Sequence, residues 1–246
     1  MFLSRIELAP DASDNPAFWR EVASPDGAHR ALWKLFRRSP QEPRNFLFRQ
    51  DDGGSRGPGR VRFYVLSEQP PSTEGDGLWR LGKPKLFAPK LREGDRLRFN
   101  LRASPTVKRK SGVEEKQGRR CDVVMDARKR HPAGERPFDP VDAAQQEGER
   151  WLLRQATSAG FEIARGLVDV VCDDGLVEQM ERSALRVDGY RQHRLQRRGE
   201  APIQFSTVDF EGVLIVRDPM RFVEKVKLGF GPQKAFGCGL MLLRRA

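Results

Sequence analysis

The chain has 246 residues, with 45 Lys and Arg against 34 Asp and Glu, so its formal net charge is +11 and its isoelectric point is near 10.0. The mean hydropathy is −0.64 and the chain has no apolar run of membrane-spanning length, so we expect no membrane-spanning helix. Three cysteines are too few for a disulfide framework. We therefore expect a protein of the reducing cytoplasm.

The positive charge is concentrated in two basic windows. Residues 102–131 contain ten Lys and Arg against four Asp and Glu, and residues 182–198 contain six Arg against one Asp. The net charges of +6 and +5 add up to the +11 of the whole chain. Two local basic surfaces favour a polyanionic partner, whereas solvated basic loops are the alternative interpretation.

The first half predicts the element order strand, helix, strand, strand. Alternation over residues 2–8 predicts a strand, and apolar spacing over residues 26–36 predicts a helix that stops before Pro40. Two short strands follow at residues 46–48 and 61–66, and residues 96–102 alternate again.

The second half begins with a connector rich in Pro, Gly, Asp and Gln at residues 134–148. A helix is predicted from about residue 140 to 158, then a strand from Phe161 and a hairpin over residues 203–216 that turns near 209–212. A further helix begins at Asp218 and Pro219, and a strand ends the chain. Each half therefore has a βαββ-type order, which predicts two α+β domains with helix-covered antiparallel sheets.

Of the three histidines, His29 is the candidate for acid–base chemistry. It lies beside the apolar stripe of the first predicted helix, with Trp33 one turn on, Asp26 one turn back and Lys34 displaced from both. A partly exposed histidine flanked by a cation and an aromatic ring suits proton transfer near a phosphate. An ordinary surface histidine is the alternative interpretation.

The cysteines lack metal-ligand spacing, so the sequence predicts no metal site and no cofactor, and a nuclease here would use acid–base chemistry. The most specific segment is the glycine-rich loop, residues 229–239, which has neither the Walker signature nor the strand-to-helix order of a dinucleotide site. Lys234 and backbone N–H groups beside glycine favour phosphate binding, with a tight structural connection as the alternative. The loop glycines are Gly229, Gly231, Gly237 and Gly239.

Six segments, in order from end to end, resemble one known family: Met1–Ile6, His29–Phe36, Asn45–Phe48, Leu101–Pro105, Phe210–Leu214 and Gly229–Leu240. On these segments the chain resembles the CRISPR repeat-processing endoribonucleases of the CasE (Cse) family, which are subunits of the type I-E Cascade complex. The resemblance implies two tandem ferredoxin-like (RRM-like) domains, here residues 1–133 with the catalytic helix and 134–246 with a basic hairpin and the glycine-rich loop.

The resemblance also implies an activity. Such enzymes cleave precursor CRISPR RNA at the 3′ base of the repeat stem-loop, without a metal ion or cofactor, by attack of a 2′-OH that leaves a cyclic phosphate. The product stays bound, so the expected partners are the repeat RNA and other Cascade subunits, in the cytoplasm and without a membrane. A non-catalytic stem-loop-binding subunit of the same fold is the alternative, and a DNA-binding protein is disfavoured because no helix-turn-helix or zinc signature is present.

The family motif makes His29 the general acid or base and Lys34 the group that offsets charge on the phosphate. Asp26 stands where many relatives have tyrosine, and it cannot donate a phenolic proton. The residues expected to contact RNA are Lys108, Arg109, Lys110, Arg119, Arg120, Arg191, Arg194, Arg197, Arg198 and Lys234, together with the glycine-rich loop.

Overall fold

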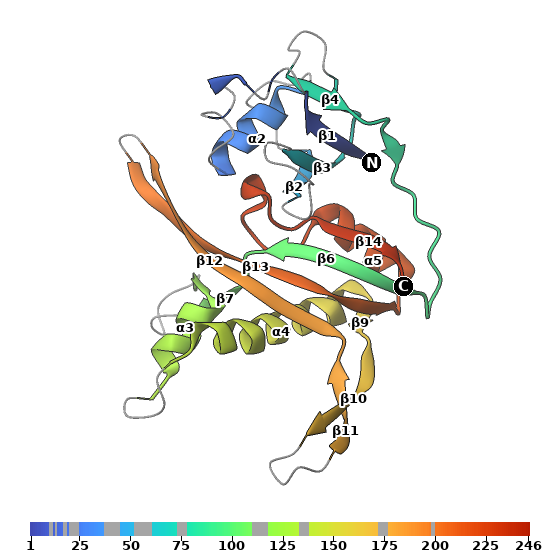
Figure 1. The fold of residues 1–246 in the computed structure, drawn as a ribbon, viewed down its shortest axis with the longest axis vertical. Helices are drawn as coiled ribbons and strands as arrows, with labels where there is room; N and C mark the ends of the chain where they lie inside the picture. The colour runs from blue at the N-terminus through green and yellow to red at the C-terminus, as the bar shows by residue number, and fades with distance from the viewer. Residues whose placement is uncertain are drawn as a thin grey trace. The chain divides into compact units, whose positions relative to one another are not determined.

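The structure is a computed structural model that describes residues 1–9, 12, 14–16, 19, 25–36, 45–51, 61–72, 78–109, 118–132, 138–171, 177–197 and 200–246. The chain forms two compact units (Figure 1). Unit 1 contains Met1–Lys90 and Lys227–Leu240, and unit 2 contains Leu91–Val226 and Met241–Ala246. No helix in these described ranges is long and apolar enough to cross a membrane.

Unit 1 is built on an antiparallel sheet with the strand order β2-β3-β1-β4, in which β5 also pairs with β1. The helix α2 (Pro25–Trp33) lies between β1 and β2 in the chain. This order, with a helix after the first strand, is the ferredoxin-like arrangement. The strands are β1 (Phe2–Leu8), β2 (Phe46–Gln50), β3 (Arg62–Ser67), β4 (Trp79–Leu81) and β5 (Lys85–Leu86).

The core of unit 1 forms where α2 covers one face of this sheet. Alternate residues of a strand share a face, so Ile6 of β1 and its cross-strand partner Phe63 of β3 are both buried against the helix. The helix contributes Ala28, Ala31 and Leu32, which recur at helical spacing and are buried in the same cluster. The apolar residues whose spacing predicted the helix are therefore the ones that pack against the sheet.

Unit 2 repeats the arrangement with the strand order β12-β13-β6-β14, and β9 also pairs with β13. In chain order these four strands again read second, third, first and fourth, so the predicted pair of ferredoxin-like folds is confirmed. The strands are β6 (Arg96–Ala103), β9 (Phe161–Ile163), β12 (Leu185–Arg197), β13 (Glu200–Val216) and β14 (Met241–Arg245). Two further hairpins are β7 (Thr106–Arg109) with β8 (Arg119–Asp122), and β10 (Arg165–Val171) with β11 (Val177–Ser183).

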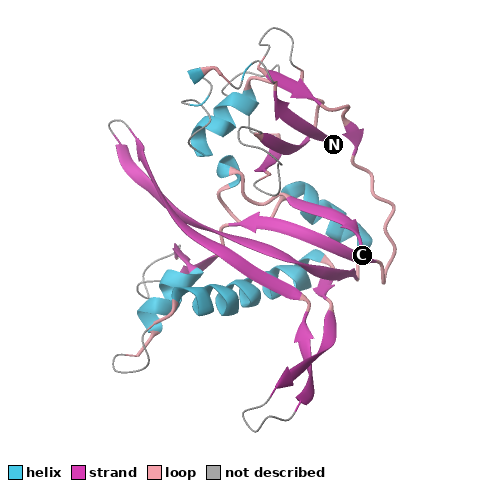
Figure 2. Cartoon of the chain, viewed as in Figure 1, coloured by secondary structure: helices cyan, strands magenta, loops and turns pink. Residues whose placement is uncertain are grey.

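The helices of this part are α3 (Val123–Arg130), α4 (Pro140–Ala159) and α5 (Pro219–Leu228). Figure 2 shows α4 alongside the strands of the sheet, where Trp151 stacks on Phe210 of β13 at a ring-centroid distance of 5.7 Å. The carboxylate of Asp139 caps α4 by accepting from the Val141 N–H at 2.7 Å. Gly160, with φ of 73°, ends the helix in the left-handed conformation that favours glycine.

The predicted hairpin turn at residues 209–212 is wrong. The strand β13 runs without interruption from Glu200 to Val216 and pairs with β12, so the connection lies between Arg197 and Glu200. Gly212 was interpreted as a turn residue, but it lies inside the strand, where the backbone passes close to Ala184. The carbonyl of Ala184 accepts a hydrogen bond from the Val213 N–H at 3.0 Å.

The compact units also differ from the expected halves, residues 1–133 and 134–246. The strand β6 pairs with β13 and β14, so it belongs to unit 2 together with the basic segment that follows it. The glycine-rich loop, expected in the C-terminal half, belongs to unit 1. Pairing of β6 with strands distant in the chain explains the first difference, and packing of the short 3-10 helix of the loop (Lys234–Phe236) on α2 and β2 explains the second.

The close passage at Gly212 predicts a selective loss of stability. A Cβ at this position would overlap the carbonyl oxygen of Ala184 and lie 3.2 Å from the Phe99 ring, whereas a Cβ at Gly166 of β10 would meet nothing within 4 Å. We expect Gly212→Ala to lower the free energy of unfolding by about 1–3 kcal/mol. Gly166→Ala should change it by no more than about 0.5 kcal/mol. Urea unfolding followed by circular dichroism measures both, and equal losses would contradict this packing argument.

Candidate functional site

His29 lies on α2 in unit 1, half-buried in an aromatic cluster. Its ring centroid is 5.5 Å from that of Trp33, one turn further along the helix, and 5.6 Å and 6.1 Å from those of Phe46 and Phe48 on β2. The imidazole plane is inclined by only 26° and 27° to the two phenylalanine rings. Rings on both elements therefore set the orientation of the imidazole, and its Nε2 atom is buried.

The glycine-rich loop is folded against this histidine helix. The short 3-10 helix η2 (Lys234–Phe236) inside the loop lies against both α2 and β2. A Cβ at Gly237 would lie 3.3 Å from the Phe48 ring, the same ring that packs beside His29. Two motifs that lie about 200 residues apart in the sequence are thus parts of one structure in unit 1.

The loop glycines satisfy a backbone requirement. Gly239 has φ of 94°, and a Cβ there would lie 2.9 Å from the carbonyl oxygen of Phe230. The Phe230 N–H donates to the Gly239 carbonyl at 3.0 Å and closes the loop. Gly229 has φ of 80° and packs against Leu47. These contacts fit the structural interpretation of the loop, and phosphate binding by it stays a prediction.

The other predicted residues of this site are placed less fully. Lys34 is exposed in the turn that follows α2, and Lys234 is half-buried in η2. Asp26 lies in the first turn of α2, and its side chain is outside the described part of the structure. Within the described ranges no three His, Cys, Asp or Glu side chains gather where they could hold a metal ion.

A second candidate region lies in unit 2, where α3 meets the hairpin of β12 and β13. Asp122, the last residue of β8, caps α3 by accepting from the Met125 N–H at 2.7 Å. The same carboxylate accepts hydrogen bonds from the Tyr190 hydroxyl, at 3.3 Å, and from the Ser206 hydroxyl, on the two strands of the hairpin. Asp122 therefore joins the helix to both strands.

A groove of about 830 Å³ opens between these elements, and both basic windows contribute to it. From the first window come β8 and α3, and from the second come Tyr190 and residues 192–194 of β12. The two basic windows lie in different halves of the chain as predicted from the sequence, residues 1–133 and 134–246, whereas the structure places both in unit 2. The residues that line the groove are Arg109, Arg119, Arg120, Cys121, Asp122, Met125, Asp126, Lys129, Tyr190, Gln192, His193, Arg194, Gln204, Phe205 and Ser206.

The cations of the groove fall into two groups. Arg109 is held by Asp126 through two hydrogen bonds, at 2.9 and 2.7 Å, and Arg130 contacts the same carboxylate at 3.1 Å. The Arg109 guanidinium, followed by Arg130, holds the pKa of Asp126 below its usual value, although burial opposes this. Part of the positive charge of the first window therefore forms ion pairs within the protein.

A different set of cations is exposed in the groove and makes no ion pair with any residue that the structure describes. Three of them, Arg119, Arg120 and Arg194, were predicted to contact RNA. The fourth, Lys129 in the last turn of α3, was not singled out from the sequence, although its place in the basic window was the signal available. These four side chains can bind an anionic ligand without first breaking an internal ion pair.

Two of the remaining predicted contacts, Lys108 and Arg191, are described and do not line the groove. Lys108 is exposed on β7, and Arg191 is exposed on the face of β12 opposite to Arg194. Arg197 ends β12 but its side chain is not described, and Lys110 and Arg198 fall outside the described residues.

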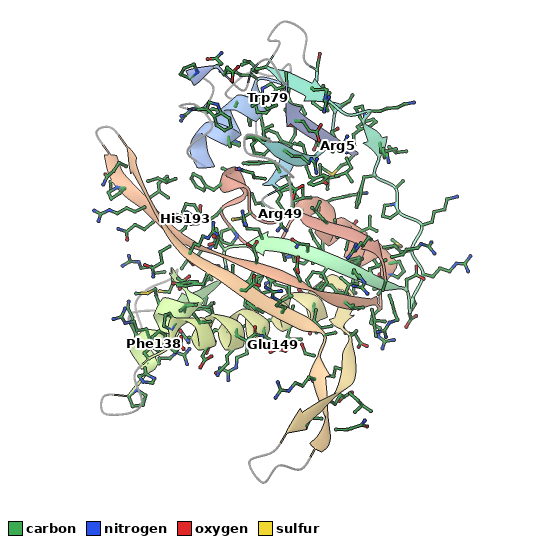
Figure 3. All side chains as sticks on the ribbon, viewed as in Figure 1. Arg5, Arg49, Trp79, Phe138, Glu149 and His193 are labelled. Atoms are coloured by element: carbon green, nitrogen blue, oxygen red, sulfur yellow. The ribbon has the colours of Figure 1, made fainter. Side chains whose placement is uncertain are left out.

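His193, labelled in Figure 3, is a structural residue of the hairpin. Its ring stacks on Phe205 of the neighbouring strand at 4.7 Å, and its Nε2 lies 2.9 Å from the Thr207 hydroxyl. Burial lowers the pKa of His193, and the nearby charges of Arg102 and Arg191 lower it further. The neutral imidazole is therefore favoured at neutral pH.

Comparison with known proteins places this geometry in a family. One family model, described as CRISPR associated protein, matches residues 1–245. The CRISPR-associated endoribonuclease Cse3 of Thermus thermophilus is 29% identical over 245 residues, which are 98% of each chain. The CRISPR system Cascade subunit CasE of Escherichia coli is 26% identical over 248 residues, covering 99% of this chain and 98% of that one.

The fold comparison agrees with the sequence comparison. The structure of CRISPR endoribonuclease Cse3 bound to 19 nt RNA has a TM-score of 0.71 and 27% identity to this chain, and the match covers 99% of this chain and all of that one. The resemblance noted in the sequence is thereby confirmed over the full length. The chain belongs to the family of CRISPR-associated proteins, as a member of the CasE (Cse) type.

Proposed function

We propose that this protein is a metal-independent endoribonuclease that binds the stem-loop of a CRISPR repeat RNA and cuts the precursor at the 3′ base of the stem. It then stays on its product as a subunit of a Cascade complex in the cytoplasm. The proposal is supported by the end-to-end match to proteins named as an endoribonuclease and as a Cascade subunit.

One structural observation carries the RNA-binding part of the proposal, namely the convergence of both basic windows on one groove. Arg119, Arg120, Arg194 and Lys129 face this groove and have no acidic partner among the described residues. Closely spaced cations of this kind suit successive phosphates of a polynucleotide, because each contact releases a bound counterion. Arg is also well suited to phosphate because its planar guanidinium can donate two hydrogen bonds at once.

The cutting step is assigned to unit 1. The 2′-oxygen of the nucleotide before the scissile bond loses its proton and forms a bond to phosphorus. The bond from phosphorus to the 5′-oxygen breaks, and that oxygen takes up a proton, which leaves a 2′,3′-cyclic phosphate and a 5′-OH. His29 is the residue that we assign to proton transfer, since it is the one titratable side chain in the aromatic cluster of α2 and β2.

The environment of His29 suits a positioned catalyst. Phe46, Phe48 and Trp33 restrict the imidazole to one orientation, and restricted orientation is what proton transfer to a fixed phosphate requires. Lys34 follows α2 in an exposed turn, and we assign to it the stabilisation of the negative charge that develops on the phosphate. We leave Asp26 without an assigned step.

A second candidate function is a stem-loop-binding subunit that does not cut. The buried Nε2 of His29 favours this alternative, because a buried nitrogen cannot reach a substrate without a movement of its surroundings. Asp26, in the place where many relatives have tyrosine, points in the same direction. Incubation of the purified protein with the repeat RNA of its own host separates the two candidates.

Replacement of His29 tests the catalytic assignment. We expect His29→Ala to lower the cleavage rate by at least about 100-fold, since loss of general acid–base catalysis typically has this effect. The affinity for the stem-loop should change by less than about threefold, because the basic groove is in unit 2. Single-turnover cleavage and filter binding measure the two quantities. His131→Ala is the matched control, and undiminished cleavage by the His29 variant would contradict the assignment.

The chemistry of the cut is tested on the substrate. A stem-loop with a 2′-deoxynucleotide immediately before the scissile phosphate lacks the nucleophile, so it should remain uncut while binding as tightly as the unmodified RNA. A chelator such as EDTA should leave the rate on unmodified RNA unchanged. Cleavage of the deoxy substrate, or abolition of activity by EDTA that Mg²⁺ restores, would show that a different mechanism operates.

A further inference from the structure

The carboxamide of Gln192, on the groove face of β12, has its orientation fixed by its neighbours. Its Nε2 group donates to the Tyr190 hydroxyl at 3.0 Å and to the Met125 sulfur at 3.2 Å. A carboxamide has two N–H bonds, so these two contacts use both of its donors. Its Oε1 atom accepts no hydrogen bond from the described residues, and the side chain is exposed in the groove.

The direction of this network comes from Asp122. As a carboxylate, Asp122 only accepts, so the Tyr190 hydroxyl must donate its proton to it at 3.3 Å. The lone pairs of the Tyr190 oxygen then face Gln192 and require a donor there. Burial, together with the nearby Asp122 charge, raises the pKa of Tyr190 to about 12, so the phenol keeps its proton at neutral pH.

The opposite orientation of the carboxamide is unfavourable. It would place Oε1 against the Tyr190 oxygen, whose hydroxyl already donates its hydrogen bond to Asp122. It would also place Oε1 against the Met125 sulfur, which is an acceptor. Gln192 therefore presents an acceptor, and no donor, to whatever occupies the groove.

The surroundings of Gln192 identify the class of ligand. Arg194 is two residues further along the same face of β12, and Arg120 of β8 and Lys129 of α3 also line the groove. These cations suit a sugar–phosphate backbone, and a space of about 830 Å³ is large enough for a nucleotide. A neutral acceptor among backbone-binding cations is a group that can distinguish one base from another.

We propose that Gln192 is a specificity-determining residue, whose Oε1 accepts a hydrogen bond from the exocyclic amino group of adenine or cytosine at one position of the bound RNA. On the major-groove edge, guanine and uracil carry a carbonyl oxygen at the corresponding position, so in the same pose two acceptors would be in contact. The base must be unpaired or at the end of the stem, because the major groove inside an RNA duplex is closed to side chains. This inference rests on the proposed RNA-binding function.

The experiment is a binding selection on a pool of stem-loop RNAs whose loop, flanking and closing positions are randomised, followed by sequencing of the bound fraction. For the unmodified protein we expect enrichment of adenine and cytosine over guanine and uracil by about tenfold at one position, the effect of a single base contact. In Gln192→Ala this preference should fall below about twofold at that position only, with the other preferences unchanged.

Two further variants distinguish a reading role from a structural one. Tyr190→Phe keeps Gln192 but removes the hydroxyl that fixes its carboxamide, so the preference at this position should weaken by more than the preferences at the other positions. Gln196→Ala removes an exposed carboxamide of the same strand that does not line the groove, and it should leave every preference unchanged. Thermal unfolding of each variant confirms that the fold is retained.

The possible outcomes separate this inference from the proposed function. If no stem-loop RNA is enriched, the RNA-binding function itself fails. If stem-loops are enriched but adenine and cytosine are not preferred at any position, or if Gln192→Ala retains that preference in full, the function stands and the role of Gln192 is overturned.

Discussion

The carboxylate of Asp122 is the interaction on which the basic groove depends. It caps α3 by accepting a hydrogen bond from the Met125 N–H, and it accepts hydrogen bonds from the hydroxyl groups of Tyr190 and Ser206 on the β12–β13 hairpin. These contacts join a helix from the first basic window to a hairpin from the second, in segments that are more than 60 residues apart in the chain. An acidic residue thus brings two basic surfaces together, and each of its contacts satisfies a polar group that would otherwise lose water without compensation.

The charge of the two windows has two uses in the structure. Arg102 forms a paired contact with Asp209, at 2.9 and 2.7 Å, and Arg109 forms a similar one with Asp126. These arginines hold the sheet, the β7–β8 hairpin and α3 in place. The groove cations that make no ion pair with a described residue are available to a ligand without the loss of such a pair, so the net charge of the sequence overstates the charge that the groove offers. The exposed members of such pairs add little stability of their own, and their value lies in positioning.

The elements that follow local periodicity could be predicted from the sequence, whereas α3, β12 and the hairpins β7–β8 and β10–β11 were missed. The buried stripe of α2 and the alternation in β1 and β6 are visible in single segments. Gly212 misled the prediction, because a glycine that permits close backbone passage looks the same in a sequence as one that permits a turn. The unit boundaries depend on which strands pair, and the pairing of β6 with β13 joins residues that are more than 100 positions apart.

The candidate sites were predicted in part for the same reason. The His29 helix and the glycine-rich loop each have a local signature, but only folding shows that Phe48 contacts both. Lys129 and Gln192 were missed because a cation and an amide inside a basic stretch have no distinctive spacing. The pairing of Arg109 with Asp126 was equally hidden, since it depends on how the β7–β8 hairpin packs on α3.

The most direct measurement is the affinity of Asp122→Ala for a repeat stem-loop RNA at fixed ionic strength, beside Asp122→Asn and Glu149→Ala. Removal of a negative charge from an RNA-binding surface should by itself tighten binding. If Asp122 holds the groove in its binding conformation, Asp122→Ala should instead bind at least about fivefold more weakly. Loss of the cap and of its hydrogen-bond partners should destabilise that conformation by about 1 kcal/mol or more, which corresponds to this change in affinity. Asp122→Asn, which can still cap, and Glu149→Ala, which lies outside the groove lining, should bind no more weakly than the unmodified protein. Unchanged or tighter binding by a folded Asp122→Ala protein would contradict the account.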